Sequence, residues 1–392
     1  MSKRVLFWGR FDPGYSRNRV YAALFRELGW EVDYFFVKWF PRFGDVEAAL
    51  RGLGRRPKPD LVWVPVARQR DILAACRWAH KRGVKVLFDP MISAWDKKVL
   101  EQRKWKAEET RARKLLARET KMMNAPDMVT WDTSCHVDFC AQTLNVPREK
   151  MRVLLTGTDE AVFKPMVPGA TCLVPGAELK NQDSRASNAP GTKHQALSSK
   201  HPSPFTLHPS PFKVLYHGAY LPLHGTEYIV EAARMTQDED IQWDFLGWGA
   251  YKAETEAKAA GIRNIRFLEK VPYVDVPKVI CAHDVVLGVF GTTAKASRVI
   301  GNKVYECMAC ARPTINEFCT GYPPEAKDCP AIKFVPPGDA KAIADAVRAY
   351  RDDWTRRDFY FAAARDFFEK HLSMAVIKGQ LASILADMGF GA

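Results

Sequence analysis

The sequence alternates short apolar runs with segments of helical periodicity, and it does so twice. The runs that we interpret as buried strands lie at residues 5–9, 31–37, 60–65, 84–88, 128–131 and 152–155, and again at 213–216, 242–246, 265–268 and 284–290. Short strands that alternate with helices form βα units, whose strands pair in parallel. We therefore predict an α/β fold of two doubly wound, Rossmann-like domains that face each other across a cleft.

Residues 166–212 interrupt this alternation. They are rich in Pro, Ser, Gly, Asn and His, and the sequence HPSPF occurs in them twice, at 201–205 and 208–212. A segment of this composition cannot bury a core, so we interpret it as a linker or insertion. The predicted organisation is a first domain at 1–165, this linker, a second domain at 213–353, and a helical tail at 354–392. We expect the tail to pack back towards the first domain.

The positive charge is concentrated in the first domain. The whole chain has a net charge of +13, and residues 1–165 alone hold 32 Lys and Arg against 20 Asp and Glu. Such a bias indicates an anionic partner. The segment 97–123 carries ten Lys and Arg together with Trp105, and a cationic helix with a Trp can lie on an anionic membrane. The alternative is a solvated helix that packs on its own sheet.

Cysteine usage and hydropathy favour a cytoplasmic protein. The first residues read as a strand without a signal-peptide pattern, and no uncharged apolar run approaches the length of a membrane span. The nine cysteines, an odd number, are expected to be reduced thiols. Cys307 and Cys310 have a zinc-like spacing, but they lie inside an apolar helix pattern, where small buried cysteines are common. We expect no metal site and no cofactor. We also expect a location in the cytoplasm, and contact with the inner face of the membrane stays open.

The stretch 290–311 carries the residues most suited to ligand binding. It follows the apolar run 285–290, passes through a loop with Lys295 and Arg298, and enters a predicted helix at Asn302 with Lys303 and Glu306 near its start. Open α/β sheets bind ligands at the carboxyl ends of their strands. Cations and a helix N-terminus suit a phosphate, and a carboxylate can accept from ribose hydroxyls. The alternative is an ordinary βα loop with a solvated basic face.

Several spaced motifs resemble a known family. They are GWG at 247–249, VPYVDVPKVICAHDVVLGVF at 271–290, NKVYECMACARPTI at 302–315, LLTGTDEAVFKP at 154–165 and LGWEVDYF at 28–35. In this order they resemble the GT-B glycosyltransferases, in particular family 4 of the retaining enzymes, also called group 1. The resemblance covers essentially the whole chain outside 166–212.

The resemblance implies a retaining glycosyltransferase that moves a sugar from a nucleotide-diphosphate sugar to a glycan or glycolipid acceptor, as in cell-envelope polysaccharide biosynthesis. It also implies that the second domain binds the donor, that the first binds the acceptor, and that no metal is essential. Glu306 matches the family's ribose-binding Glu. The further residues that we expect at the donor are Asn302, Lys303, Gly218, His224, Gly225 and Gly247.

The chain departs from the family pattern at the diphosphate. Arg298 stands where the family has the first Glu of its pair, and the family's two loop cations fall near Ala219 and His224. We hypothesise that Lys295 and Arg298 replace those cations and stabilise the departing diphosphate.

The first domain supplies weaker candidates at its strand ends. Asp89 ends the fourth predicted strand, where the family usually has a His, and it could contact a sugar hydroxyl or assist the acceptor; it could equally be a turn residue before Pro90. The remaining candidates for the acceptor side of the cleft are Gly14, Arg17, Asn18, Asp132 and His136. Arg17 could instead be a surface charge.

Two other function classes remain open. One is a sugar-nucleotide epimerase of related fold, although the hinge-like TGTDEAVF at 156–163 favours a transferase. The other is a non-catalytic basic protein that binds a membrane surface. No nucleic-acid-binding motif or stacking pattern of aromatic residues accompanies the basic runs, so we expect no nucleic-acid partner.

Overall fold

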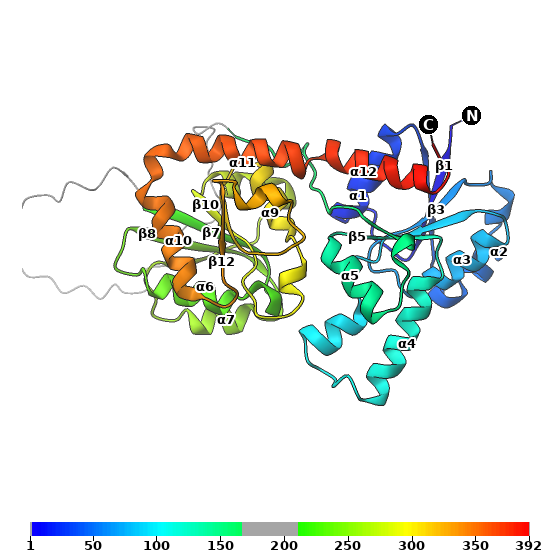
Figure 1. Ribbon diagram of the computed structural model, residues 1–392, viewed down its shortest axis with the longest axis horizontal. Helices are drawn as coiled ribbons and strands as arrows, with labels where there is room; N and C mark the ends of the chain where they lie inside the picture. The colour runs from blue at the N-terminus through cyan, green and yellow to red at the C-terminus, as the bar shows by residue number, and fades with distance from the viewer. Residues whose placement is uncertain (1, 167–210, 392) are drawn as a thin grey trace, which may run out of the picture.

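The computed structural model describes residues 2–166 and 211–391. The chain forms two α/β domains, and each is built on a six-stranded parallel sheet (Figure 1). This architecture confirms the predicted fold class. Nearly all of the predicted linker lies outside the described residues. Within the described residues, no helix combines the length and apolar character needed to span a membrane.

The first sheet has the strand order β2-β1-β3-β4-β5-β6. Its strands are β1 (Arg4–Gly9), β2 (Glu31–Phe36), β3 (Leu61–Val64), β4 (Lys85–Phe88), β5 (Met128–Trp131) and β6 (Met151–Val153). The chain leaves β1 for β2 on one side and returns to β3 on the other. The order therefore reverses between β1 and β3, where a doubly wound sheet opens a crevice.

Helices cover both faces of this sheet. They are α1 (Ser16–Glu27), α2 (Gly44–Leu50), α3 (Ile72–His80), α4 (Thr110–Asn124) and α5 (Ser134–Thr143), with short helices η1 (Pro41–Phe43), η2 (Leu53–Arg55), η3 (Asp96–Glu101) and η4 (Arg148–Lys150). The basic segment 97–123 is not one helix, because η3 ends at Glu101 and α4 begins only at Thr110. Its apolar residues Trp105, Leu115 and Leu116 pack with Trp95. The structure thus favours the alternative in which this segment packs on its own domain.

The second sheet has the order β12-β11-β10-β7-β8-β9. Its strands are β7 (Phe212–Ala219), β8 (Ile241–Trp248), β9 (Ile265–Leu268), β10 (Val285–Leu287), β11 (Thr314–Glu317) and β12 (Ile332–Val335). Its helices are α6 (Thr226–Arg234), α7 (Lys252–Lys258), α8 (Val276–Cys281), α9 (Asn302–Ala309) and α10 (Ala340–Asp352), with η5 (Pro222–His224), η6 (Tyr273–Asp275), η7 (Ala296–Arg298) and η8 (Pro324–Lys327). Here the strand order reverses between β7 and β10.

Strand β10 is shorter than the predicted strand at 284–290. The regular strand ends at Leu287, although the Gly288 amide and the Val289 carbonyl still bond to β11. A Cβ atom at Gly288 would lie 1.4 Å from the Asn316 side-chain oxygen. The Phe290 and Gly291 amides then donate to the His224 and Leu223 carbonyls. These bonds join the loop after β10 to the loop after β7, so the two loops at the point of strand reversal form one unit.

The C-terminal helices lead back to the first domain (Figure 1). After η9 (Trp354–Arg356), α11 (Arg357–His371) packs on α9, and α12 (Met374–Asp387) packs on α1. The Gln380 side chain accepts from the Leu155 amide at 3.1 Å, and Arg152 pairs with Asp387 at 2.7 Å. The tail therefore joins the domains a second time.

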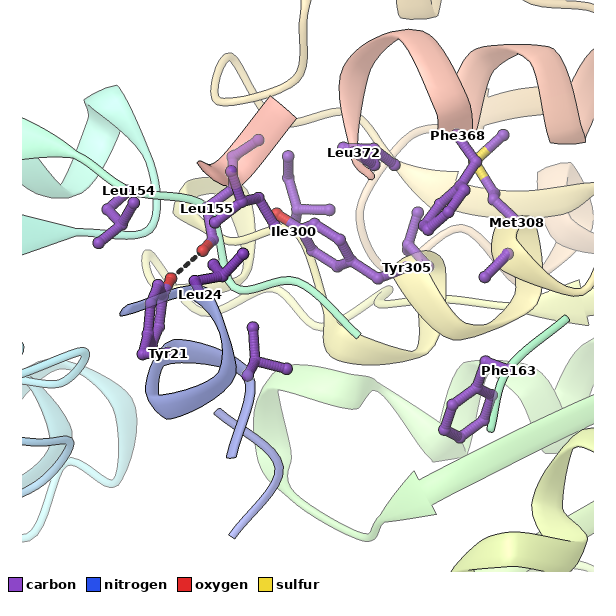
Figure 2. Packing of buried hydrophobic residues seen from close by; sticks show 14 of the residues in the cluster. Tyr21, Leu24, Leu154, Leu155, Phe163, Ile300, Tyr305, Met308, Phe368 and Leu372 are labelled. Carbon is purple, nitrogen blue, oxygen red and sulfur yellow. Dashed lines mark hydrogen bonds between the residues drawn. The ribbon is translucent and has the colours of Figure 1, made fainter. Parts of the chain in front are cut away.

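One apolar cluster runs through both domains and the tail (Figure 2). Leu24 of α1, Tyr305 of α9 and Phe368 of α11 all belong to it and are fully buried or nearly so. The Tyr21 hydroxyl donates to the Leu155 carbonyl inside this cluster. Because the packing is continuous, the two faces of the cleft are held in a defined relative position.

Candidate functional site

The loops at the strand reversal of the second domain bring the predicted donor residues together. His217 and Gly218 lie near the carboxyl end of β7, and the chain after β10 begins at Gly288. Helix α9 starts at Asn302, and its Lys303 side chain lies beside Gly218. The carboxyl ends of β7 and β10 are adjacent in the sheet. This is where an open α/β sheet offers a ligand crevice.

Glycines at this position allow the backbone segments to approach closely. Gly218 and Gly247 face each other in the pairing of β7 with β8, and a Cβ on Gly247 would lie 1.9 Å from the Gly218 carbonyl oxygen. Gly225 has a φ of +61° at the start of α6, and a Cβ there would lie 2.7 Å from the Phe290 backbone. Side chains at Gly247 and Gly225 would push the neighbouring backbone segments apart, which accounts for glycine at these two predicted positions.

Lys303 is buried beneath the segment 218–225, which carries Gly218 and Gly225 and which we call the glycine loop. Its Nζ donates to the Gly288 carbonyl at 3.2 Å and lies 4.1 Å from the centre of the Tyr216 ring. Its aliphatic chain lies under Gly218. Burial lowers the pKa of Lys303 to about 7, and the nearby Glu306 only partly opposes this effect. An anion in the crevice would stabilise the charged ammonium.

Glu306 lies next to His217 at the cleft surface. The Glu306 Oε2 is 3.6 Å from the His217 Nδ1, and 16% of the Glu306 side chain is exposed. Burial raises the pKa of Glu306 to about 8 and, assisted by Lys303, lowers the pKa of His217 to about 3. At neutral pH the two groups are therefore uncharged, and the carboxyl is available to a hydroxyl-bearing ligand.

His224 does not supply a cation to the glycine loop. Its Nδ1 contacts the Ala219 carbonyl and lies 2.9 Å from the Tyr216 hydroxyl. Burial, together with the positive charge of Lys303, holds its pKa well below the usual range. A neutral imidazole fixes the shape of the loop, and any direct contact with the donor remains a prediction.

Lys295 and Arg298 face the first domain. The Arg298 Nη2 donates to the Asp96 Oδ1 at 2.7 Å, and the Lys295 Nζ donates to the Glu101 Oε2 at 3.2 Å. Both carboxylates come from η3, and all four side chains are at most 13% exposed. In this arrangement the two cations join the domains. Their hypothesised role as replacement diphosphate cations therefore has a competing explanation and stays untested.

Asp89 and Arg17 form one buried ion pair in the first domain. The two Asp89 oxygens accept from the Arg17 Nε and Nη2, each at 2.7 Å, and both side chains are essentially unexposed. Thr130 also donates to Asp89, and Arg17 donates to the Leu154 and Leu155 carbonyls. Both oxygens thus accept from donors of the first domain, so a structural role competes with the predicted contact of Asp89 with substrate, which stays a prediction. The buried pair also corrects the reading of Arg17 as a surface charge.

Asp132 and His136 form a second buried pair after β5. The His136 Nδ1 lies 2.5 Å from the Asp132 Oδ1, and both side chains are at most 5% exposed. The Thr133 hydroxyl accepts from the His136 amide and caps α5. Burial alone would raise the pKa of Asp132, but His136 and Arg17 outweigh it and the pKa is lowered. An Asp that orients an imidazole beside the cleft fits a binding role, which remains a prediction.

The loop before α1 lies at the domain interface. Gly14 donates through its amide to the Asp12 side chain at 2.8 Å, and the Asn18 side chain donates to the Asp12 carbonyl at 2.7 Å. Ser16 then contacts the Tyr273 hydroxyl of the second domain at 3.3 Å. Gly14 and Asn18 therefore shape a loop that crosses the cleft, and contact with an acceptor is not tested by these bonds.

Solved structures share this architecture at low sequence identity. The Anabaena protein Alr3699/HepE in complex with UDP and glucose has a TM-score of 0.65 at 13% identity, covering 98% of this chain and 100% of its own. Sucrose-phosphate synthase from Thermosynechococcus elongatus has a TM-score of 0.70 at 15% identity, with 99% of each chain covered. The apo lipopolysaccharide outer core galactosyltransferase WaaB has a TM-score of 0.59 at 12% identity, covering 98% of this chain and 99% of its own. These likenesses show the fold.

A family model decides the nature of the second domain. Residues 211–353 match the model described as "Glycosyl transferases group 1". No curated protein matches the chain significantly in sequence. The second domain is a group 1 glycosyltransferase domain. This match bears out the predicted family and enzyme class for residues 211–353, and the solved structures share the fold of the whole chain.

Two residues that the sequence did not single out lie at the strand reversals of the two sheets. His217 is the neighbour of Glu306, and its Nε2 is buried without a partner among the described residues. Asp71 lies at the strand reversal of the first domain beside Gly9, where burial raises its pKa to about 6 and its Oδ1 has no described partner. The strand pattern could have located His217, since this residue directly follows the predicted strand at 213–216. Asp71 precedes α3 and looks like an ordinary helix cap in the sequence.

Within the described residues, no group of three or more His, Cys, Asp or Glu side chains is arranged to hold a metal ion. Cys307 lies in α9 and Cys310 directly follows this helix, and both are fully buried. The expectation that catalysis needs no metal stays a prediction.

Proposed function

We propose that the chain is a retaining glycosyltransferase that transfers a sugar from a nucleotide-diphosphate sugar to a glycan or lipid-linked acceptor. The observation that carries the proposal is the position of Glu306 in a group 1 glycosyltransferase domain, at the strand reversal, beside a glycine-lined crevice. Structures of similar fold were obtained in complex with UDP and with UDP-glucose. That similarity supports a nucleotide-sugar donor here.

In the proposed donor complex, Glu306 contacts the ribose hydroxyls and the diphosphate lies over Gly218 near α9. Breaking the bond between the sugar and the diphosphate leaves negative charge on the phosphate oxygens. Lys303 stabilises that charge from below, and the amides at the start of α9 act from the side. Burial lowers the pKa of Lys303 to about 7, so incoming phosphates draw a proton onto it.

The first domain is proposed to hold the acceptor in the crevice between β1 and β3. The Arg17–Asp89 pair keeps the neighbouring strand ends in place. Asp71 lies at this crevice with a pKa of about 6, so it is ionised at neutral pH and is suited to accept a hydrogen bond from an acceptor hydroxyl.

The test is a donor and acceptor array read by mass spectrometry. We expect a glycosylated acceptor and a free nucleoside diphosphate to form together, and nuclear magnetic resonance of the product to show the anomeric configuration of the donor. A variant with Glu306→Ala should lose most of this activity, whereas Glu254→Ala, at an exposed helical position of the same domain, should keep it. Conversion of the nucleotide sugar to a stereoisomer without any acceptor would instead identify an epimerase.

A further inference from the structure

An exposed apolar surface lies on the first domain, outside the donor crevice. Its side chains, which we call the aromatic surface, belong to η1, α2 and the loop before them: Trp39, Phe40, Phe43, Val46 and Leu50. Each is more than half exposed, and Phe40 and Leu50 reach 70% and 72%. Apolar patches of this kind on a folded domain commonly mark an interaction site.

Helical spacing and one buried carboxylate hold the aromatic surface together. Phe43, Val46 and Leu50 are separated by three and four residues, so they lie on one side of the helix, while Glu47 and Ala48 point into the domain. Glu47 accepts from the Lys38 and Trp39 amides, at 2.9 Å and 3.0 Å. These two hydrogen bonds hold the loop that carries Trp39 and Phe40 against α2. The apolar side chains are therefore presented by a defined structure.

A groove with unpaired arginines adjoins the aromatic surface. The cavity has a volume of about 710 Å³ and lies between η1, α2, α3 and α4, with Phe43 and Val46 in its wall. The Arg42, Arg70 and Arg118 side chains line it, and none has a hydrogen-bond or ion-pair partner among residues 2–166 and 211–391. The fourth arginine of the groove, Arg77, is neutralised by Asp45 at 2.7 Å.

The charges around the surface have one sign. Residues 36–58 contain six Lys and Arg and only two acids, Asp45 and Glu47, and both acids are already paired with arginines of the same domain. Unpaired guanidinium groups beside exposed aromatic rings match the two layers of an anionic bilayer surface, namely phosphate headgroups and the apolar region beneath them.

We propose that this surface docks the protein on an anionic phospholipid bilayer. Arg42, Arg70 and Arg118 bind headgroup phosphates in the groove, and the aromatic surface enters the interfacial layer. The proposal takes only Arg118 from segment 97–123, because Trp105, Leu115 and Leu116 of that segment pack within the domain. Helix α2 lies on the side of the first domain away from the second (Figure 1). Docking therefore leaves the proposed donor crevice open and does not depend on the proposed function.

The experiment measures flotation of the full chain with vesicles of phosphatidylcholine alone or with added phosphatidylglycerol. We expect binding only with phosphatidylglycerol. The triple variant Arg42→Gln, Arg70→Gln and Arg118→Gln should bind about a hundredfold more weakly, since each cation near an anionic surface contributes about fivefold. The double variant Phe40→Ser and Phe43→Ser should weaken binding at every salt concentration, because it removes the apolar part.

The matched control removes the same number of charges from the same domain. Lys104, Lys106 and Arg113 are exposed in the basic segment 97–123, and their replacement by Gln should leave vesicle binding within about twofold of the wild type. Circular dichroism and thermal unfolding check that each variant is folded. Absence of binding by the wild type, or equal losses in the two triple variants, would overturn the proposal. Equal losses would show that only net charge matters.

Discussion

Arg298 of the second domain donates to Asp96 of the first at 2.7 Å, and the two side chains are only 13% and 2% exposed. The Arg298 guanidinium also stacks on Phe139, and its backbone carbonyl accepts from Thr133. A cation that the sequence assigns to the donor phosphates is thus bound to the opposite face of the cleft. The Arg298–Asp96 pair holds the domains together in this structure.

The first prediction concerns this cross-domain pair. Asp96→Asn should destabilise the chain by about 3–5 kcal/mol, because it leaves Arg298 buried without its counter-charge. Urea unfolding of Asp96→Asn, Arg298→Met and the double variant gives the coupling free energy. A coupling near zero would mean that the two groups do not interact in solution.

The same variants test the hypothesised phosphate role of Arg298. If Arg298 leaves Asp96 to bind the diphosphate, Asp96→Asn should strengthen nucleotide-sugar binding and Arg298→Ala should reduce turnover severely. Calorimetric titration and a steady-state assay measure the two effects. A fully active Arg298→Ala enzyme would limit Arg298 to the domain interface.

A second buried pair, Arg17–Asp89, should matter for stability. Asp89→Asn leaves the buried Arg17 charge uncompensated, so we expect a loss of about 3–5 kcal/mol in the free energy of unfolding. The matched control is Asp238→Asn, because the Asp238–Arg263 pair is more than 70% exposed and should contribute less than about 1 kcal/mol. If Asp89→Asn unfolds like the wild type but loses activity, the original assignment of Asp89 to catalysis would be supported.

Donor binding should depend on pH through Lys303 and Glu306. Lys303 has a pKa lowered to about 7, so its charged form prevails below pH 7 and is lost above it; Glu306, with a pKa raised to about 8, becomes anionic over a similar range. Both changes disfavour a diphosphate as pH rises. Affinity for a nucleotide sugar should therefore fall between pH 7 and 9, by up to about tenfold per pH unit.

Calorimetry in buffers of different ionisation enthalpy checks this linkage. At pH 8 the wild type should take up protons as the donor binds. Lys303→Met should take up fewer, and Glu306→Gln should reveal the Lys303 contribution alone. Donor binding without proton uptake at pH 8 would show that the diphosphate binds too far from Lys303 to change its protonation.

The sequence predicted the fold because its patterns are local. Short apolar runs such as 128–131 coincide with β5, and Gly218 and Gly247 lie where two strands need close approach. Long-range pairing could not be predicted in this way. Asp89 looks like a turn residue or an acid in a cleft, and only the position of Arg17, 72 residues away, shows that it is neutralised.

Surface features were likewise hidden from pattern reading. The segment 97–123 has the composition of a membrane-binding helix, yet the break between η3 and α4 lets its apolar residues pack inward. The aromatic surface at 39–50 was missed because its apolar residues resemble core positions of a short helix. Whether an apolar side chain is exposed depends on which neighbouring helices and strands cover it. A single sequence does not show that packing.

The most direct test of the account is donor binding at the crevice around Gly218 and Glu306. Thermal unfolding of the wild type should be measured with UDP-, GDP- and ADP-sugars, since a ligand at a hundred times its Kd stabilises the folded state by about 2.7 kcal/mol. We predict that at least one raises the Tm, that Glu306→Ala loses most of the shift, and that Glu254→Ala keeps it. Absence of a shift with every nucleotide sugar, or an undiminished shift in Glu306→Ala, would contradict the account.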